Sequence, residues 1–89
     1  MQEFDPDHAY AYHSTHEAEL AAAEARRGRN LHGPFHSFHE GWGVMQEELE
    51  ELFDEIRVKN PSYESIHTEA IQVAAMALRI AVCARRKMN

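Results

Sequence analysis

The sequence predicts an all-α fold, with three helices in one subunit that forms a helical bundle by homo-oligomerisation. The chain contains only three prolines and four glycines, and no stretch alternates apolar and polar residues for long enough to form a strand. These breaks divide a single domain into an N-terminal helix with its connector at 1–34, a helix at 35–59 and a helix at 61–88. A chain of this length buries only about 60–65% of its unfolded surface, which favours association with a further copy.

The first helix should extend from about Pro6 to Arg27. Asp5-Pro6 is typical of an N-cap followed by the first helical residue. Ser14-Thr15-His16-Glu17 is a capping box that predicts a restart of the helix, and Gly28 is predicted to end it. Residues 18–25 are rich in Ala and Glu, which gives good helix propensity but a thin apolar face. We therefore expect this helix to be the least firmly held of the three.

The second helix carries the clearest pattern in the chain. Ser37 with Glu40 three residues later forms a capping box, and the helix should extend to about Val58. At about 100° per residue, its side chains separate into an apolar and an acidic face. The apolar face comprises Phe38, Trp42, Met45, Leu49, Leu52, Phe53 and Ile56. The acidic face comprises Glu40, Glu47, Glu50, Glu51 and Asp54, with Glu48 and Glu55 on the flank.

The third helix should begin after the Asn60-Pro61 break, with Ser62 or Ser65 as its cap, and reach about Arg86. This helix is apolar nearly all round, and three helices of one chain cannot cover it completely. A second subunit is therefore expected to cover the rest.

Composition and charge exclude several classes of function. The chain has 15 acidic residues against 9 lysines and arginines, so most of its surface would repel a nucleic-acid backbone. The single cysteine, Cys83, rules out an internal disulfide framework, and the N-terminus lacks the pattern of a secretory signal. The apolar stretch 70–83 is too short to span a bilayer. We therefore expect a cytoplasmic protein with no nucleic-acid or membrane partner.

Polar residues on the second and third helices suggest a metal site. Glu69, Gln72 and Arg79 form a narrow stripe on the otherwise apolar third helix, and burying such groups is costly unless each has a partner. Glu48 and Glu51 lie on successive turns of the preceding helix, where like charges repel one another. A divalent cation would neutralise them, and Mg²⁺ prefers oxygen ligands of this kind. The alternative is that these carboxylates form an ordinary solvated acidic face.

The run HEGWGVMQEELEELFDEI followed by TEAIQVAAMALRIA resembles the MazG-like all-α nucleoside triphosphate pyrophosphohydrolases, particularly the short versions of phages and their hosts. The family pattern is E-x-x-E on one helix and E-x-x-D on the next, with four acidic side chains that hold Mg²⁺. Glu48 and Glu51 match the first half, and Glu69 begins the second. Gln72 stands where the family has Asp, which removes one negative charge from the expected ligand set.

The resemblance implies cleavage of a nucleoside or deoxynucleoside triphosphate into a monophosphate and pyrophosphate, with Mg²⁺, or Mn²⁺ as a substitute, as cofactor. The implied metal ligands are Glu48, Glu51, Glu69 and Gln72, and Glu47 or Glu55 would be a base or further ligand around them. Arg79 is the first candidate for phosphate binding and Lys59 a weaker one. Trp42 and His39 are candidates for contact with the base.

Two other readings of the sequence concern binding without catalysis. The first is a MazG-like scaffold that sequesters a nucleotide or docks on a host protein, which Gln72 and the small size favour. The second is a zinc site among the seven histidines, which we do not expect because they form no recognised metal-binding motif.

Overall fold

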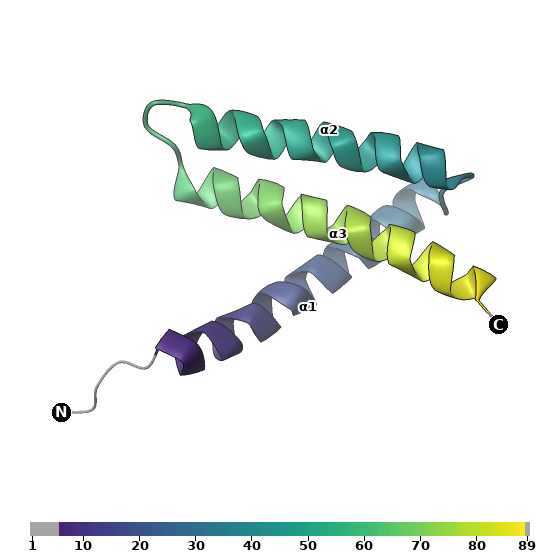
Figure 1. The fold of residues 1–89 in the computed structure, drawn as a ribbon, viewed down its shortest axis with the longest axis horizontal. Coiled ribbons are helices and arrows are strands. Elements are labelled where there is room, and N and C mark those ends of the chain that lie inside the picture. The colour runs from purple at the N-terminus through teal and green to yellow at the C-terminus, as the bar shows by residue number, and fades with distance from the viewer. Residues whose placement is uncertain (1–5, 89) are drawn as a thin grey trace.

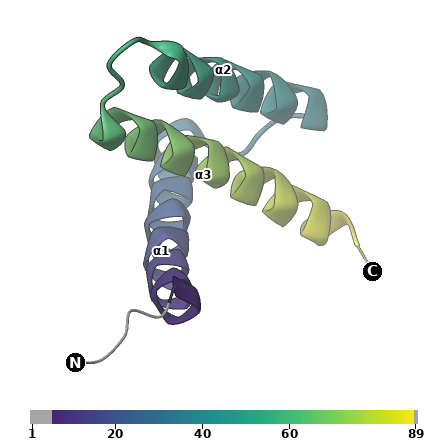
Figure 2. The same cartoon turned by 60° about the vertical axis from the view of Figure 1, so that its left-hand side comes forward.

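The computed structural model describes residues 6–88 and confirms the all-α fold, with three helices and no strand in that part of the chain (Figure 1). They are α1 (Pro6–His32), α2 (Phe38–Arg57) and α3 (Tyr63–Lys87). Helices α2 and α3 lie side by side and antiparallel, whereas α1 crosses α3 steeply on its other side (Figure 2). Helix α3 is therefore the central element, and the other two helices both pack on it.

Helices α2 and α3 begin at the predicted caps. The Ser37 hydroxyl accepts a hydrogen bond from the backbone N–H of Glu40 at 3.0 Å. The Glu40 carboxylate does not close a capping box on Ser37, because it accepts from the backbone and ring of His36 instead. Of the two cap candidates for α3, Ser62 holds the position and accepts from the N–H of Ser65 at 3.1 Å. These local patterns therefore set both helix starts.

Helix α1 is longer than the sequence predicts, and two of the predicted boundaries are wrong. It passes through 14–17 without a restart, and there the hydroxyls of Ser14 and Thr15 donate back to the carbonyl of Ala11. It also passes through Gly28 and ends at Gly33, whose φ of 76° favours glycine and whose N–H donates to Arg29 O at 2.9 Å. The predicted N-cap, Asp5, lies outside the described residues.

Small side chains allow the helices to approach one another closely. Ala21 of α1 is 3% exposed, and Ala75 and Met76 of α3 are 0% and 6% exposed. Gly41 of α2 is buried, and Gly28 of α1 is buried beside the Arg79 side chain of α3. The contacts between helices therefore bury few large side chains, which leaves the single chain with a thin core.

The apolar stripe of α2 is left largely uncovered. Trp42, Phe53 and Ile56 are 52%, 59% and 50% exposed. Glu48 and Glu55, which the sequence places on the flank of α2, are instead partly buried. The acidic flank of α2 therefore lies closer to the interior of this chain than much of its apolar stripe does.

Side chains on the α1–α3 interface form polar contacts between the two helices. The Gln72 amide donates to the Glu24 carboxylate at 2.9 Å, and Glu17 pairs with His67. Arg27 also donates to Glu24, at 3.0 Å. Arg27 and then Gln72 hold the pKa of Glu24 at about 2, well below its ordinary 4.5. The contacts of Gln72 and His67 tie α1 to the N-terminal half of α3.

Helix α3 is long and apolar enough to cross a membrane, judged by length and composition alone. The core helix of a soluble protein meets the same criteria. Glu69, Gln72 and Arg79 interrupt the apolar surface of α3, and each is partly or fully buried against the rest of the chain.

Two glycines of α2 should respond oppositely to alanine. A Cβ on Gly41 would lie 3.0 Å from Ile80 Cγ1 and 3.0 Å from Phe35 Cδ2, whereas one on Gly43 would have no neighbour within 4 Å. We expect Gly43→Ala to stabilise the fold by about 1 kcal/mol through helix propensity. Gly41→Ala should lose about 1 kcal/mol, because crowding at this contact outweighs the same gain. Urea unfolding measures both, and equal stability of the two variants would contradict the close packing at Gly41.

Candidate metal centre

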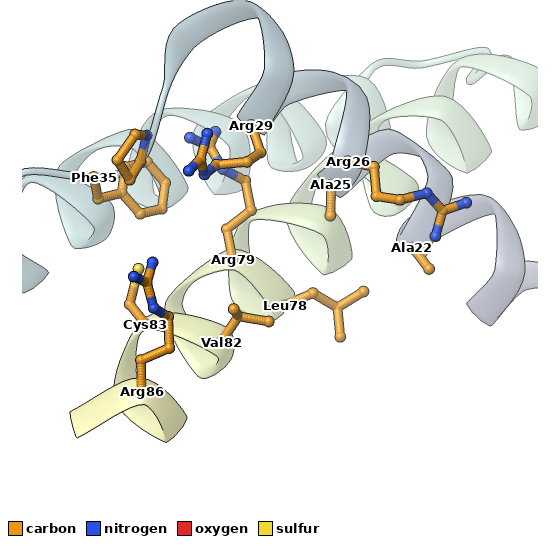
Figure 3. Close-up of a pocket in the computed structure, with 11 residues that line it drawn as sticks. Ala22, Ala25, Arg26, Arg29, Phe35, Leu78, Arg79, Val82, Cys83 and Arg86 are labelled. Carbon is orange, nitrogen blue, oxygen red and sulfur yellow. The ribbon is translucent and has the colours of Figure 1, made fainter. Parts of the chain in front are cut away.

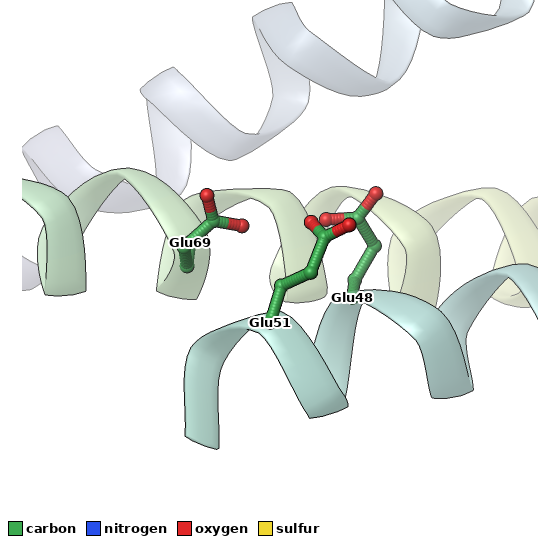
Figure 4. Close-up of side chains that lie close together, drawn as sticks. All are labelled: Glu48, Glu51 and Glu69. Atoms are coloured by element: carbon green, nitrogen blue, oxygen red, sulfur yellow. The ribbon is translucent and has the colours of Figure 1, made fainter. Parts of the chain in front are cut away.

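Three carboxylates from two helices meet near the middle of the α2–α3 pair. Glu48 and Glu51 come from α2 and Glu69 from α3, and each offers an oxygen that lies within 4.8 Å of the other two (Figure 4). The spacing of three residues puts Glu48 and Glu51 on neighbouring turns of one helix face. The antiparallel course of α3 then brings Glu69 opposite them. The structure thus unites the three carboxylates that the sequence selects.

The cluster contains a buried oxygen with no partner. Oε2 of Glu69 is inaccessible to solvent and has no hydrogen-bond partner among the described residues. A buried, unpaired carboxylate oxygen is costly, and such groups normally have a partner or an ion. Glu48 and Glu69 are partly buried, while Glu51 is exposed. The cluster is therefore open to solvent on the side of Glu51.

Burial and mutual repulsion act on the same carboxylates. Burial raises the pKa of Glu48 above its ordinary value, and the negative charge of Glu51 raises it further. Burial, followed by the charge of Glu51 and then that of Glu55, raises the pKa of Glu69. The cluster therefore takes up protons more readily than exposed glutamates do, and a cation would relieve the same repulsion.

The donor set fits a hard divalent ion. Oxygens bound opposite one another on an ion lie about 4.2 Å apart for Mg²⁺ and about 4.8 Å apart for Ca²⁺, given their usual bond lengths. Each of the three carboxylates offers one oxygen, and these oxygens lie within 4.8 Å of one another, so the side chains would have to draw closer together to share one ion. Three carboxylates without nitrogen or sulfur donors also match the preference of Mg²⁺, Mn²⁺ and Ca²⁺.

Glu47 and Glu55 lie on α2, before and after Glu48 and Glu51 in the sequence. The charge of Glu47 raises the pKa of Glu48, and that of Glu55 raises the pKa of Glu69. Glu47 is exposed, whereas Glu55 is partly buried. Glu55 is therefore the better placed of the two to complete the ligand set.

Gln72 faces a different partner from the one predicted. Its amide nitrogen donates to Glu24 of α1, a contact that joins residues 48 positions apart. The sequence contains no local signal for this bond, and Glu24 is absent from the predicted site. A place for Gln72 among the metal ligands stays a prediction, and its amide already ties α3 to α1.

Arg79, the first candidate for phosphate binding, lies away from the cluster along α3, and phosphate binding by Lys59 stays a prediction. Arg79 is ten residues from Glu69, about 15 Å along an α-helix. Arg79 is 9% exposed, and its guanidinium donates to the Gly33 carbonyl at 2.9 Å and lies 4.1 Å from the centre of the Phe35 ring. Lys59 is exposed in the connector between α2 and α3. Arg79 therefore has a structural role in holding the α1–α2 connector.

The predicted base-contacting residues lie on the first turns of α2. Trp42 is half-exposed, and His39 lies at a surface hollow that Phe35 and Phe38 also line. Contact of either side chain with a base stays a prediction.

Comparison of the chain with known protein families, characterised proteins and solved structures gives no match.

Proposed function

We propose that this protein is a divalent-metal-dependent nucleoside triphosphate pyrophosphohydrolase of the MazG-like type. The observation that carries this proposal is the meeting of Glu48, Glu51 and Glu69, with one buried, unpaired oxygen on Glu69. Buried carboxylates that repel one another are expected where a cation is held. The resemblance of the two helix sequences to that family supplies the class of reaction.

In this proposal, Glu48, Glu51 and Glu69 hold Mg²⁺, with Mn²⁺ as a substitute. A bound divalent ion supplies charge neutralisation on phosphate oxygens and lowers the pKa of a bound water. Glu51 faces solvent and leaves room for a triphosphate to approach. Glu47 and Glu55 are the nearest further carboxylates, and either can accept a proton from the attacking water. Cleavage between the α and β phosphates gives a nucleoside monophosphate and pyrophosphate.

Pyrophosphate release from a panel of nucleoside and deoxynucleoside triphosphates tests the activity directly. We expect release with Mg²⁺ or Mn²⁺, none with chelator, and a loss of at least about a hundredfold for Glu48→Gln, since it removes a ligand charge. Glu50→Gln changes an exposed glutamate of the same helix and should retain the wild-type rate. Equal rates for the two variants would refute a catalytic role for the cluster.

A second candidate function is nucleotide binding without turnover. Gln72 favours it, because its neutral amide stands where the family has a carboxylate, and the cluster offers three carboxylates instead of four. Fewer ligand charges lower the affinity for magnesium. Metal-dependent nucleotide binding in calorimetry, without pyrophosphate release, would support sequestration over hydrolysis.

We further propose that the working unit is a homodimer or larger oligomer that covers the apolar stripe of α2. Trp42, Phe53 and Ile56 are each at least half-exposed, and contiguous apolar surface of this kind marks an interaction site. The single chain also has a thin core, so a second copy would supply much of the missing burial. This interface leaves the carboxylate cluster on the flank of α2.

Phe53→Lys should convert the oligomer to a monomer. The substitution places a charge in the proposed apolar interface, where burial of a charge is costly. Lysine is chosen over an acidic residue because the chain already has a net charge of −6, and a further negative charge would add general repulsion between copies. Tyr63→Lys is the matched control, because Tyr63 is 85% exposed at the start of α3, outside the stripe. Sedimentation equilibrium measures the mass of each variant, and a wild-type chain that is already monomeric would contradict the proposal.

A further inference from the structure

An apolar pocket of about 320 Å³ lies on the opposite side of α3 from α2, between the C-terminal halves of α1 and α3 (Figure 3). Ala25 of α1, Leu78 and Val82 of α3, and Phe35 of the connector form much of its wall. Leu78 and Val82 are 39% and 58% exposed, so an incoming apolar group would gain burial there. The volume is at the lower end of that of small-molecule sites.

Arginines surround this pocket. Arg26 and Arg29 come from α1 and Arg86 from α3, and Figure 3 shows them around the apolar side chains. Within residues 10–88, none of these three arginines forms an ion pair with a carboxylate. Unpaired guanidinium groups around an apolar cavity, on a chain of net charge −6, are complementary to an anion with an apolar body.

The pocket is separate from the carboxylate cluster. Val82 lies 13 residues beyond Glu69, about 20 Å along an α-helix, so the negative charge of the cluster is largely screened there. Neither Glu48, Glu51 nor Glu69 lines the pocket. A ligand in this pocket would therefore act independently of the proposed hydrolysis.

We propose that this pocket binds a small amphipathic anion, an aliphatic chain that ends in a carboxylate or a phosphate monoester. The aliphatic chain packs on Ala25, Leu78 and Val82, and the anionic group accepts hydrogen bonds from Arg26 and Arg29. Arg86 of α3 also lines the pocket and adds to its positive charge. Arg79 also lines the pocket, but its hydrogen bond to Gly33 commits it to the fold.

Alkylation of Cys83 tests the site, because this half-buried thiol lines the pocket and is the single cysteine of the chain. Octanoate and octyl phosphate, below their micellar concentrations, should each slow the reaction of Cys83 with iodoacetamide at least about threefold. Octanol, which has the same chain without the charge, should protect far less. Protection by either anion supports the site, and the stronger one identifies the head group.

Arginine variants locate the anionic end. Arg26→Gln/Arg29→Gln should weaken protection by octanoate about fivefold, the effect expected for two exposed charge contacts. Arg57→Gln, an exposed arginine of α2 outside the pocket, should leave it unchanged. Equal protection by octanol, no protection by either anion, or an unchanged affinity of the double variant would overturn the proposal. Pyrophosphate release is not involved in these measurements, so they stand apart from the test of hydrolysis.

Discussion

Mg²⁺ or Mn²⁺ should raise the melting temperature of this protein strongly at pH 7 and leave it nearly unchanged at pH 4. An ion that binds the folded state at 100 times its dissociation constant contributes about 2.7 kcal/mol. For a domain of this size, that corresponds to a rise of roughly 10–20 °C. Differential scanning calorimetry with and without the ion measures the effect.

The pH dependence follows from the raised pKa values of Glu48 and Glu69. Below the ordinary value of 4.5 both groups are protonated in the folded and unfolded states, so ionised oxygens are not available to a metal. As the pH rises through the raised folded pKa, the folded state must ionise groups that the unfolded state ionises more easily. Stability without metal is therefore lost over this range, and we expect a bound ion to restore it at pH 7.

Glu48→Gln should separate the effect of charge repulsion on stability from the effect of metal binding. Without metal it should raise the melting temperature at pH 7, because it removes one of the mutually repelling charges. Addition of metal should raise the melting temperature of this variant only a little further, because the substitution removes a proposed ligand. Glu50→Gln, on the exposed side of the same helix, should keep the full response to metal. A metal response that is the same in both variants would rule out the cluster as the binding site.

The sequence predicts the local features of this fold well. The caps Ser37 and Ser62 depend on contacts with the next few residues, and the structure confirms both. The meeting of Glu48 and Glu51 with Glu69 follows from helical spacing and an antiparallel pair, so it too can be expected from the pattern. These features need little knowledge of distant parts of the chain.

Features that depend on distant contacts could not be predicted in this way. Gly28 was predicted to end α1, but Arg79, 51 residues later, packs against it and the helix continues to Gly33. Gln72 carries no sequence signal for its bond to Glu24 across the α1–α3 interface. The burial of the acidic flank of α2 likewise depends on how α2 rotates against α3, which periodicity alone does not fix.

Arg79→Ala should destabilise the fold by about 2–4 kcal/mol, a large part of the stability of a small domain. The substitution removes the hydrogen bond to the Gly33 carbonyl and the stacking on Phe35, and it leaves a gap beside Gly28. These contacts hold the end of α1 and the connector to α2 against α3. Urea unfolding measures the loss, with Arg86→Ala, an exposed residue two turns further along α3, expected to change stability by less than about 0.5 kcal/mol.

The same variant distinguishes the structural role of Arg79 from the phosphate-binding role that the sequence suggests. If Arg79 has a structural role, Arg79→Ala lowers the unfolding midpoint to the same extent with and without nucleotide. Arg79→Lys should restore little of the lost stability, because an ammonium group lacks the planar surface of the guanidinium, which lies 4.1 Å from the Phe35 ring centre. A phosphate ligand would leave the midpoint unchanged and weaken nucleotide binding. That second outcome would mean that the guanidinium can leave Gly33 and Phe35 without cost. The 9% exposure of Arg79 and its hydrogen bond to the Gly33 carbonyl argue against this.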